Sequence, residues 1–417
     1  MRIFQKGEWK LFWPLYLAYF FGIMMPDVDI LIMIFFFAKG FTATQIGIGF
    51  GLMSLFVILA EIPTGAIADL FGKRISVQVH WLIHGITTAM FFFVTAPWQM
   101  WVLFSIQGVS ATFASGAMDA LPYEMAIQAN RKDLIKEFYG KIHAIVRFSQ
   151  SISYFLTLGF LYLVGSTTYY YFYGPRQGLD FLWFTSAAGF LIAFIIVFKI
   201  KEKVHRKRFN FAESIKDTYK ISLEGIKYSG QHPVVRKLFA AGFFLVVAAL
   251  FFSDIVYQPF LLDLGFKAEN IALIVAVASV FGGIFCLIPK FIEKRFKTEK
   301  HYLQAFVILD LILLLLLFIF AGPVISIIFF LIYFNLKDLI YPVWMPFNQL
   351  FYKKEIRATI GSVSGVINSL AMAIFFPIVG LCVDKFGAGN TVYFAAIPLM
   401  IMFFILQSIK LKERIEH

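Results

Sequence analysis

About a dozen apolar runs, each long enough to cross a bilayer, most limit how this chain can fold. A helix needs roughly 20 apolar residues to cross the hydrocarbon core, and soluble cores do not need runs of such length. Charged residues make up only 15% of the chain, while 60% of residues are hydrophobic, unlike a soluble protein. The sequence predicts an all-α membrane protein with twelve transmembrane helices, near residues 12–37, 46–64, 75–95, 98–121, 139–164, 179–199, 236–259, 269–289, 302–321, 324–346, 358–381 and 391–409.

The distribution of Lys and Arg predicts which ends of these helices face the cytoplasm. If both termini lie inside, only four of the 37 Lys and Arg fall in outer segments: Lys39, Arg176, Lys267 and Lys385. This bias follows the positive-inside rule and predicts a multi-pass protein of a bacterial inner membrane with cytoplasmic N and C termini. The net charge of +12 is therefore explained by topology and by anionic membrane lipid, and it does not indicate a nucleic-acid partner.

The first span is expected to be retained as a helix. It follows a basic N-terminus, but no small-residue cleavage site follows it, and Asp27 and Asp29 interrupt it, so it does not resemble a signal peptide. The two cysteines, Cys286 and Cys382, lie in predicted spans, where packing is a better explanation than a disulfide.

A charged segment divides the chain in the middle. It separates the sixth span from the seventh, and its apolar residues recur every three or four positions, which predicts a helix on the membrane surface. We therefore expect an N-terminal six-helix bundle (1–198), a cytoplasmic linker (199–235) and a C-terminal six-helix bundle (236–417). The apolar positions of the linker are Phe211, Ile215, Tyr219, Leu223 and Ile226.

The two predicted bundles are repeats of each other. The segment Gly40-Phe41-x-Ala43-x-Gln45-Ile46 recurs as Gly265-Phe266-x-Ala268-x-Asn270-Ile271, a shift of 225 residues. The same shift places Asp29 on Asp254. Two six-helix pseudo-repeats predict a substrate site at their interface, near the middle of the membrane.

One polar run between the second and third spans carries a family signature. It reads Glu61-Ile-Pro-Thr-Gly65-Ala-Ile-Ala-Asp69-Leu-Phe-Gly72-Lys73-Arg74, and its glycines, acids and bases suit a tight cytoplasmic connection. The run resembles the loop between helices 2 and 3 of major facilitator superfamily (MFS) transporters, Gly-x-x-x-Asp-x-x-Gly-(Arg/Lys)-(Arg/Lys). A degenerate second copy follows the eighth span, from Pro289 to Lys297.

The resemblance covers essentially the whole chain and implies an MFS fold with alternating access. It implies a conformational latch formed by Glu61, Gly65, Asp69, Gly72, Lys73 and Arg74, in which Asp69 engages the start of helix 11 near residues 357–361. The segments Glu61-x-Pro-Thr-Gly65 and Ser115-Gly-x-x-x-Ala-Leu-x-Tyr-Glu124 are similar to a bacterial branch of drug or macrolide efflux carriers.

Two departures separate the chain from many proton-coupled drug antiporters of that family. Phe104 stands where those carriers have an Arg, three residues before Gln107-Gly108. The fifth span, residues 140–164, contains no Pro and so lacks their Gly-Pro antiporter motif. Arg147 in this span is a candidate replacement for the missing Arg.

Charges inside spans are the strongest candidates for a substrate or proton site, because each costs about 2.5–3.5 kcal/mol at mid-bilayer. Asp29 and Asp254 come first, since the repeat places them at equivalent heights on helices 1 and 7. They could bind a cationic group, carry a proton, or do both. The alternative is that one only bonds neighbouring polar groups. Asp27 lies two residues from Asp29, on a different face of a helix, and has no repeat partner.

Further candidates lie on helices 4, 5 and 10. Arg147 could pair with Asp119 or Glu124, as a structural ion pair or as an anion or coupling site. Lys337 and Asp338 are adjacent, so they point apart and are not expected to pair only with each other. Lys337 in a cavity would favour a carboxylate or phosphate on the substrate; a local ion pair is the alternative.

The sequence predicts neither an enzyme nor a metal or cofactor site. His80 and His84 are four residues apart, a spacing that can ligate a metal, but no Cys or acid supports them. No Walker-type loop or Gly-x-Ser-x-Gly elbow is present.

The sequence as a whole predicts a monomeric secondary carrier that moves a small amphipathic solute, coupled to protons or to Na⁺. Efflux is favoured over uptake. A carrier of an anionic metabolite held by Lys337 or Arg147 is the main alternative, and a non-transporting sensor or scaffold is a minor one.

Overall fold

The computed structural model describes residues 4–165, 168–171, 174–202, 223, 225–285, 288–320, 322–353 and 357–411. Its contacts divide the chain into two compact units. Unit 1 comprises Met1–Ile30 and Leu52–Thr218, and unit 2 comprises Leu31–Gly51 and Tyr219–His417. The predicted division into two bundles and a linker differs from these units in residues 31–51 and remains a proposal.

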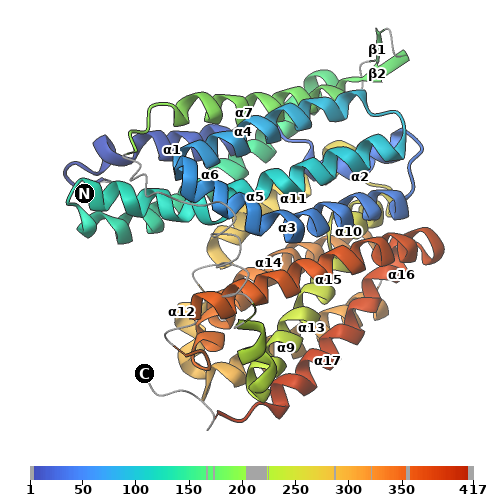
Figure 1. Ribbon diagram of the computed structural model, residues 1–417. Coiled ribbons are helices and arrows are strands. Elements are labelled where there is room, and N and C mark those ends of the chain that lie inside the picture. Colours follow the sequence, from blue (N-terminus) through green and yellow to red (C-terminus); the bar gives the residue numbers. More distant parts are fainter. Residues whose placement is uncertain are drawn as a thin grey trace. The chain divides into compact units, whose positions relative to one another are not determined.

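Unit 1 is a bundle of helices in which α4 packs against α5 and α7, and α1 packs against α6 and α7 (Figure 1). Aromatic side chains fill the core between them, with Tyr16 stacked on Phe138 at 5.2 Å between ring centroids. Its elements are α1 (Glu8–Met24), η1 (Asp29–Leu31, shared with unit 2), α3 (Ala43–Phe71, from Leu52 onward), α4 (Lys73–Met90), η2 (Phe91–Phe93), α5 (Pro97–Gln128), η3 (Lys132–Leu134), α6 (Ile135–Phe160), η4 (Leu161–Gly165), β1 (Thr168–Tyr171), β2 (Gly174–Gln177), η5 (Gly178–Phe181) and α7 (Leu182–Val197).

A small hairpin connects helices α6 and α7. Strands β1 and β2 pair antiparallel, with Thr168 opposite Gln177 and Tyr171 opposite Gly174. The hairpin projects beyond the ends of the unit 1 helices in Figure 1. The sequence does not predict these strands, because the segment carries no alternating pattern long enough to stand out.

Unit 2 is also helical. Helix α9 packs against α15 and α17, while α14 packs against α11 and α13. Its elements are α2 (Ile32–Ala38), the first part of α3, α9 (Pro233–Leu250), α10 (Asp254–Asp263), α11 (Ala268–Phe285), α12 (Pro289–Ile292), η6 (Glu293–Arg295), α13 (Glu299–Ile319), α14 (Pro323–Gln349), α15 (Arg357–Phe386), α16 (Ala388–Thr391), η8 (Val392–Ala395) and α17 (Ala396–Ser408).

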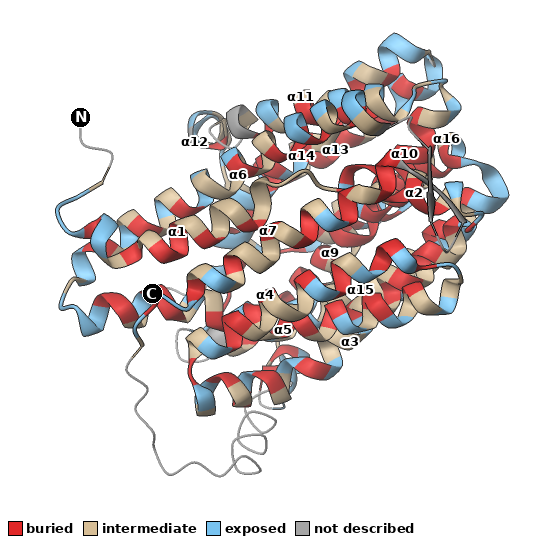
Figure 2. Ribbon diagram, turned by 90° about the horizontal axis from the view of Figure 1, so that it is seen from above, coloured by how far each residue is buried: buried red, intermediate tan, exposed pale blue. Residues whose placement is uncertain are grey.

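Burial differs sharply among these helices. Helix α10 is almost wholly buried (Figure 2), with every residue from Ile255 to Leu261 covered. Helix α13 instead exposes large apolar side chains, among them Leu315, Phe318 and Ile319. An apolar exposed face is what a helix needs where it meets lipid rather than water.

The helices coincide with the predicted spans. Among the described residues, ten helices are long and apolar enough to cross a membrane. Helices α5 and α11 occupy the other two predicted positions: α5 is less apolar, and α11 appears among the shorter apolar helices. Membrane-spanning helices are thus confirmed, and the count of twelve stays a prediction.

The polar run between the second and third spans is mostly helical, which corrects the expected loop. Helix α3 continues through Glu61 and Asp69 to Phe71, and α4 begins at Lys73. Only Gly72 makes the connection, with φ of 100°, a left-handed conformation that glycine adopts without steric cost. The predicted span of 46–64 ends too early, because charged residues such as Asp69 can continue a helix that extends beyond the hydrocarbon core.

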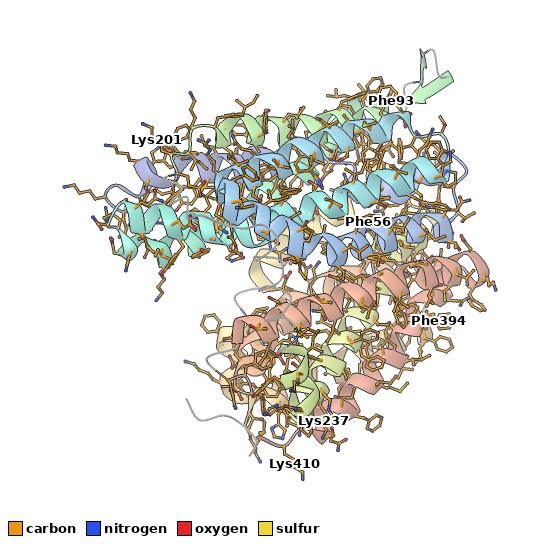
Figure 3. The ribbon with its side chains drawn as sticks, viewed as in Figure 1. Phe56, Phe93, Lys201, Lys237, Phe394 and Lys410 are labelled. Carbon is orange, nitrogen blue, oxygen red and sulfur yellow. The ribbon has the colours of Figure 1, made fainter. Side chains whose placement is uncertain are left out.

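Basic side chains gather at one end of each unit (Figure 3). In unit 1, Lys201 lies at the end where α1 begins, and Phe93 lies at the other end. In unit 2, Lys237 and Lys410 lie at the end opposite Phe394. This separation is consistent with the predicted topology, although the orientation of the termini remains a prediction.

Candidate functional site

The first membrane span is broken at its two aspartates. Helix α1 ends at Met24, and the chain is not α-helical again until Ile32. Pro26 lies in the break, where its missing N–H and fixed φ do not continue a helix. Asp27 therefore lies on irregular backbone and Asp29 begins the short turn η1, so the two are not on different faces of one helix, which corrects the expectation from their spacing.

Hydroxyl groups of α6 satisfy part of the broken backbone. Ser153 Oγ donates to the carbonyl of Met25 at 2.7 Å, and Thr157 Oγ1 accepts from the Asp27 N–H at 2.7 Å. In a membrane no water replaces lost helical hydrogen bonds, so side chains of neighbouring helices must do so.

Helix α7 supplies further hydrogen bonds to the break. Thr185 Oγ1 donates to the carbonyl of Pro26 at 2.8 Å. Ser186 Oγ lies 2.9 Å from Asp27 Oδ1 and 3.2 Å from the Pro26 carbonyl, and accepts from the Val28 N–H at 3.3 Å. Sequence reasoning missed these hydroxyls, whose signal was the spacing of Ser149, Ser153 and Thr157 on one face of α6.

The two aspartates of the break have different surroundings. Asp27 is half-buried, and its carboxylate accepts from Ser186 and from the N–H of Asp29. Asp29 is exposed. Asp27 therefore helps to hold the break, while a role of Asp29 in binding a solute or a proton stays a prediction.

The corresponding span of unit 2 is interrupted at the equivalent position. Helix α9 ends at Leu250 and α10 begins at Asp254. Ser253 closes the turn by donating from its Oγ to the Leu250 carbonyl at 2.7 Å. The repeat shift of 225 thus relates the start of the short turn at Asp29 to the start of α10. Interrupted helices at corresponding positions of two halves are a structural pointer to a carrier's binding site.

Asp254 lies in a polar cluster on α10. Its Oδ1 accepts from Tyr257 Oη at 2.8 Å and from Gln258 Nε2 at 3.3 Å. Gln258 is fully buried, and its Oε1 accepts from the N–H of Met33 on α2 at 3.0 Å. Sequence reasoning does not group Tyr257 and Gln258 with Asp254, because hydrophobic spacing does not show which neighbours reach a carboxylate.

Lys337 on α14 contributes a positive charge to the electrostatic surroundings of Asp254. Its ammonium group stands 5.0 Å above the ring of Phe334. Lys337 is exposed and Asp338 is buried, so the two point apart as predicted. Among the described residues, Lys337 has no carboxylate within salt-bridge distance.

Asp338 faces another helix of the same unit. A Cβ on Gly282 of α11 would lie 3.3 Å from Asp338 Oδ2 and 2.7 Å from Asn335 Oδ1. Gly282 therefore leaves room for two buried polar side chains of α14 at this crossing. Asp338 thus takes part in the packing between α11 and α14.

The candidates of helices 4 and 5 lie in unit 1. Arg147 is half-buried on α6, and Asp119 is exposed on α5, where its carbonyl accepts a hydrogen bond from Tyr139 Oη. Glu124 is half-buried near the end of α5. A pair between Arg147 and either acid remains a prediction.

Glu124 has an altered proton affinity. Burial raises the pKa of its carboxyl, and the carboxylates of Glu202 and Asp69 raise it further, while Lys73 acts in the opposite direction. Helix α5 has 32 residues, more than the roughly 20 that a bilayer requires, so Glu124 lies beyond the hydrocarbon core. It therefore belongs to the same polar region as the α3–α4 connection.

The residues predicted to form a latch make contacts within unit 1. Lys73 Nζ pairs with Asp69, one helical turn apart. Glu202 accepts from the N–H groups of Lys73 at 2.9 Å and Arg74 at 2.8 Å, and thus caps α4. Glu202, an acid in a Lys-rich segment, is a site residue that sequence reasoning missed. The contact of Asp69 with the start of helix 11 remains a prediction.

Glu61, the first residue of the family run, contacts α5. Ser115 Oγ donates to Glu61 Oε1 at 3.0 Å. This bond joins the two segments that resemble the efflux branch. Gly65 has open space where a Cβ would lie, so no close approach explains it.

A further acid in the membrane also escaped sequence reasoning. Asp310 on α13 is 5% exposed, and its Oδ1 has no hydrogen-bond partner among the described residues. The signal was available, since Asp310 interrupts an otherwise apolar predicted span.

Two further expectations concern metals and cysteines. His80 Nδ1 lies 2.9 Å from the carbonyl of Ser110, and the ring of His84 packs against Phe190. Within the described ranges, no group of three or more His, Cys, Asp or Glu could hold a metal ion. Cys382 is a free thiol; Cys286 and most of the predicted surface helix of the linker lie outside the described residues.

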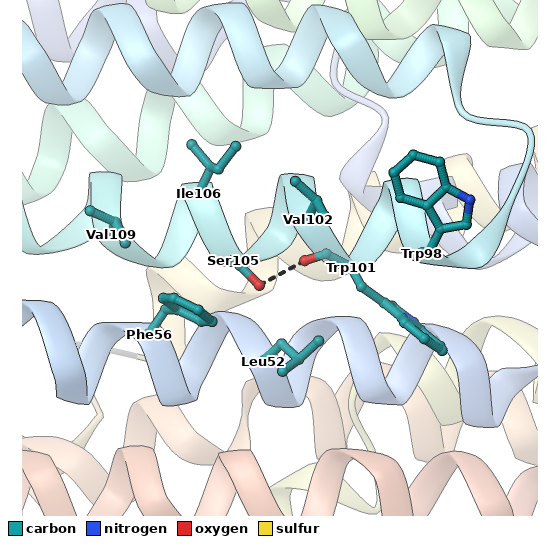
Figure 4. A pocket seen from close by; sticks show the side chains of 8 residues that line it. All are labelled: Leu52, Phe56, Trp98, Trp101, Val102, Ser105, Ile106 and Val109. Atoms are coloured by element: carbon teal, nitrogen blue, oxygen red, sulfur yellow. Dashed lines mark hydrogen bonds between the residues drawn. The ribbon is translucent and has the colours of Figure 1, made fainter.

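A groove between α3 and α5 is lined almost entirely by apolar side chains (Figure 4), unlike the polar cluster around Asp254. It measures about 430 Å³, and its one hydroxyl, Ser105 Oγ, donates to the Trp101 carbonyl of its own helix at 2.8 Å. A groove so apolar offers contact to hydrocarbon but no group that could orient a polar solute. Its lining residues are Leu52, Phe56, Trp98, Trp101, Val102, Ser105, Ile106 and Val109.

Comparison with known proteins identifies the family. An uncharacterized MFS-type transporter of Bacillus subtilis (strain 168), YxaM, is 23% identical over 392 residues, covering 91% of each chain. A crystal structure of a mutant of the nucleoside transporter NupG has a TM-score of 0.75 at 15% identity, covering 95% of this chain and 99% of its own. A D-xylose-proton symporter has a TM-score of 0.69 at 13% identity, covering 94% of both chains. The sequence profile of the Major Facilitator Superfamily matches residues 12–375, and this chain therefore belongs to the Major Facilitator Superfamily of transporters.

Proposed function

We propose that this transporter is a secondary active carrier that works by alternating access and exchanges protons for a small amphipathic solute, with efflux as its direction. The observation that carries the proposal is the cluster of Asp254, Tyr257, Gln258 and Lys337 at the interruption of a membrane helix. Ionisable groups within a membrane span are expensive and are a functional site by default.

The chemistry of this cluster suits both a proton and a solute. Tyr257 and Gln258 donate to the ionised form of Asp254, and they can reorient when the carboxyl is protonated. Tyr257 also packs against the rings of Phe330 at 5.2 Å and Phe334 at 6.0 Å. A site with charges beside aromatic faces favours a solute with one polar and one apolar part.

Efflux is supported by the likeness of two segments to efflux carriers. The bond between Ser115 and Glu61 joins them, so the resemblance rests on residues that act together. The nucleoside and xylose carriers with the same fold share too little sequence to bear on direction or substrate.

A carrier of an anionic metabolite is the second candidate. The exposed side chain of Lys337 favours it, since Lys337 stands over the ring of Phe334 and forms no salt bridge with a described carboxylate. A carboxylate or phosphate on the solute would give Lys337 the short charge-assisted hydrogen bonds that it lacks.

The test is pH-dye quenching in everted, respiring membrane vesicles, with a panel of cationic drugs and anionic metabolites. Under the proposal, a cationic amphiphile collapses the proton gradient in wild type, while Asp254→Asn and Asp29→Asn abolish the response. Asp263→Asn, at the exposed far end of α10, is the matched control and keeps it. If only anionic metabolites respond and Lys337→Gln abolishes that response, the second candidate replaces the first. A response that requires a Na⁺ gradient would overturn proton coupling.

A further inference from the structure

The first turn of α3 is capped by a side chain from the opposite end of the chain. Asp384, in the last turn of α15, accepts from the N–H of Ala43 at 2.9 Å and from the N–H of Thr44 at 2.8 Å. The Thr44 hydroxyl also donates to it. All three residues belong to unit 2.

The repeated half shows that such a cap is not needed to form the turn. Gly40 and Gly265 have matching φ values of 80° and 86°, so the turns before α3 and α11 have the same form. Helix α11 then has its own acid, Glu269, at the position that corresponds to Thr44, whereas the first turn of α3 has none. An acid at a helix N-terminus is favourable, and α3 therefore obtains its acid from a helix about 340 positions away in sequence.

Below this cap, α3 and α15 touch backbone to backbone. A Cβ on Gly47 would lie 2.4 Å from the carbonyl oxygen of Phe376, and one on Gly380 would lie 2.3 Å from that of Ala43. The rings of Phe50 and Phe376 are 5.2 Å apart between centroids. A contact of small residues and rings is held by dispersion forces and can separate without leaving a buried charge.

Helix α3 does not belong to unit 2 alone. It is continuous from Ala43 to Phe71, and its residues from Leu52 onward cluster with unit 1. Because α3 links the two units, a motion of one unit against the other acts on the contact between Asp384 and the first turn of α3.

We propose that Asp384 is a conformational latch, which holds α3 against α15 in the present state and releases it when the carrier opens at this end. The inference rests on the alternating-access cycle proposed above. The cap residues lie beside Lys39 and Lys385, which the charge bias places outside, so the latch would close the outer end. A cap that served folding alone would change stability without changing how often α3 and α15 meet.

Disulfide cross-linking in native membranes tests this proposal. The reporter is the pair Phe50→Cys and Phe376→Cys in full-length protein with Cys286 and Cys382 replaced by Ser. Asp384→Asn should slow cross-linking by about tenfold, because three charge-assisted hydrogen bonds are weakened. The cross-linking rate of Asp384→Glu should lie between the rate of the parent and that of Asp384→Asn. Glu269→Gln, which removes the acid from the counterpart helix, should leave the rate unchanged.

A second variant keeps the proposal testable if Asp384→Asn fails to fold. Thr44→Val removes only the hydroxyl donor, so it should slow cross-linking by a smaller factor with an unchanged melting temperature. If Asp384→Asn folds, a cross-linking rate equal to that of the parent would overturn the latch. If Asp384→Asn does not fold, the same result for Thr44→Val would overturn it. The assay uses neither substrate nor gradient, so an error in the proposed substrate or coupling ion would not affect it.

Discussion

At the scale of single residues, Asp310 shows how much one unpartnered group can matter. Its carboxyl is buried in α13 with an oxygen that no described residue satisfies. We predict that Asp310→Leu raises the free energy of unfolding by about 1–3 kcal/mol, because an apolar side chain of similar size carries no such penalty. Thermal unfolding in detergent measures this. A loss of stability would show that Asp310 has a partner, and a gain of stability with a loss of transport would show that it serves function.

Glu124 allows a prediction about pH. Its pKa is raised in the folded protein, first by burial and then by Glu202 and Asp69. The folded state therefore binds this proton more tightly than the unfolded state does. The resulting stabilisation is complete at pH values below the pKa of Glu124 in the unfolded state, and it is lost as the pH rises through the pKa of Glu124 in the folded state. Glu124→Gln should be more stable than wild type at neutral pH and no more stable at low pH. Melting temperatures from about pH 4, near the ordinary carboxyl pKa, to about pH 8 check this; parallel curves for the two proteins would contradict it.

At the scale of elements, the hydroxyl-bonded break between α1 and α2 carries the clearest expectation. Ser186→Ala removes the hydroxyl that meets Pro26, Asp27 and Val28. We expect a loss of about 1–2 kcal/mol in the free energy of unfolding, the range found for interhelical hydrogen bonds in model membrane peptides, because this one hydroxyl meets three backbone or side-chain groups. Ser105→Ala is the control, since that hydroxyl bonds only within its own helix and its removal should cost less. Equal effects of the two substitutions would mean that the break is held by the backbone alone.

Sequence predicted the helices well and their interruptions poorly. Apolar length is a strong signal, and every predicted span contains helix. The breaks at Asp27 and at Ser253 were not predicted, because average hydrophobicity does not register a few residues of irregular backbone. The end of α3 was misplaced for a related reason, as polar residues such as Asp69 can continue a helix beyond the bilayer.

The candidate site was predictable in part. The internal repeat singled out Asp29 and Asp254, and both lie where a membrane helix is interrupted. The proximity of Lys337 to Asp254 could not be read from sequence, because it depends on how α10 and α14 pack. Glu202 and Asp384 were missed for the same reason, since each caps a helix that is distant in sequence.

At the scale of the whole molecule, the charge bias predicts orientation. A green fluorescent protein fused after residue 417 should fluoresce, since it folds in the cytoplasm, and alkaline phosphatase fused there should be inactive. The opposite result is expected for fusions ending at Arg176, in the hairpin between α6 and α7. Active phosphatase at the C-terminus would overturn the predicted topology, and with it the assignment of Asp384 to the outer end.

The continuity of α3 has a mechanical consequence. The helix runs without interruption from the Asp384 cap at Thr44 to the Asp69–Lys73 pair, a length of about 38 Å at 1.5 Å per residue. A continuous helix of that length that tilts as one body acts as a lever: a small tilt that frees one tip displaces the other tip in the opposite direction. One helix could thus make opening at one surface and closing at the other a single event, with no signal passed through the protein between them.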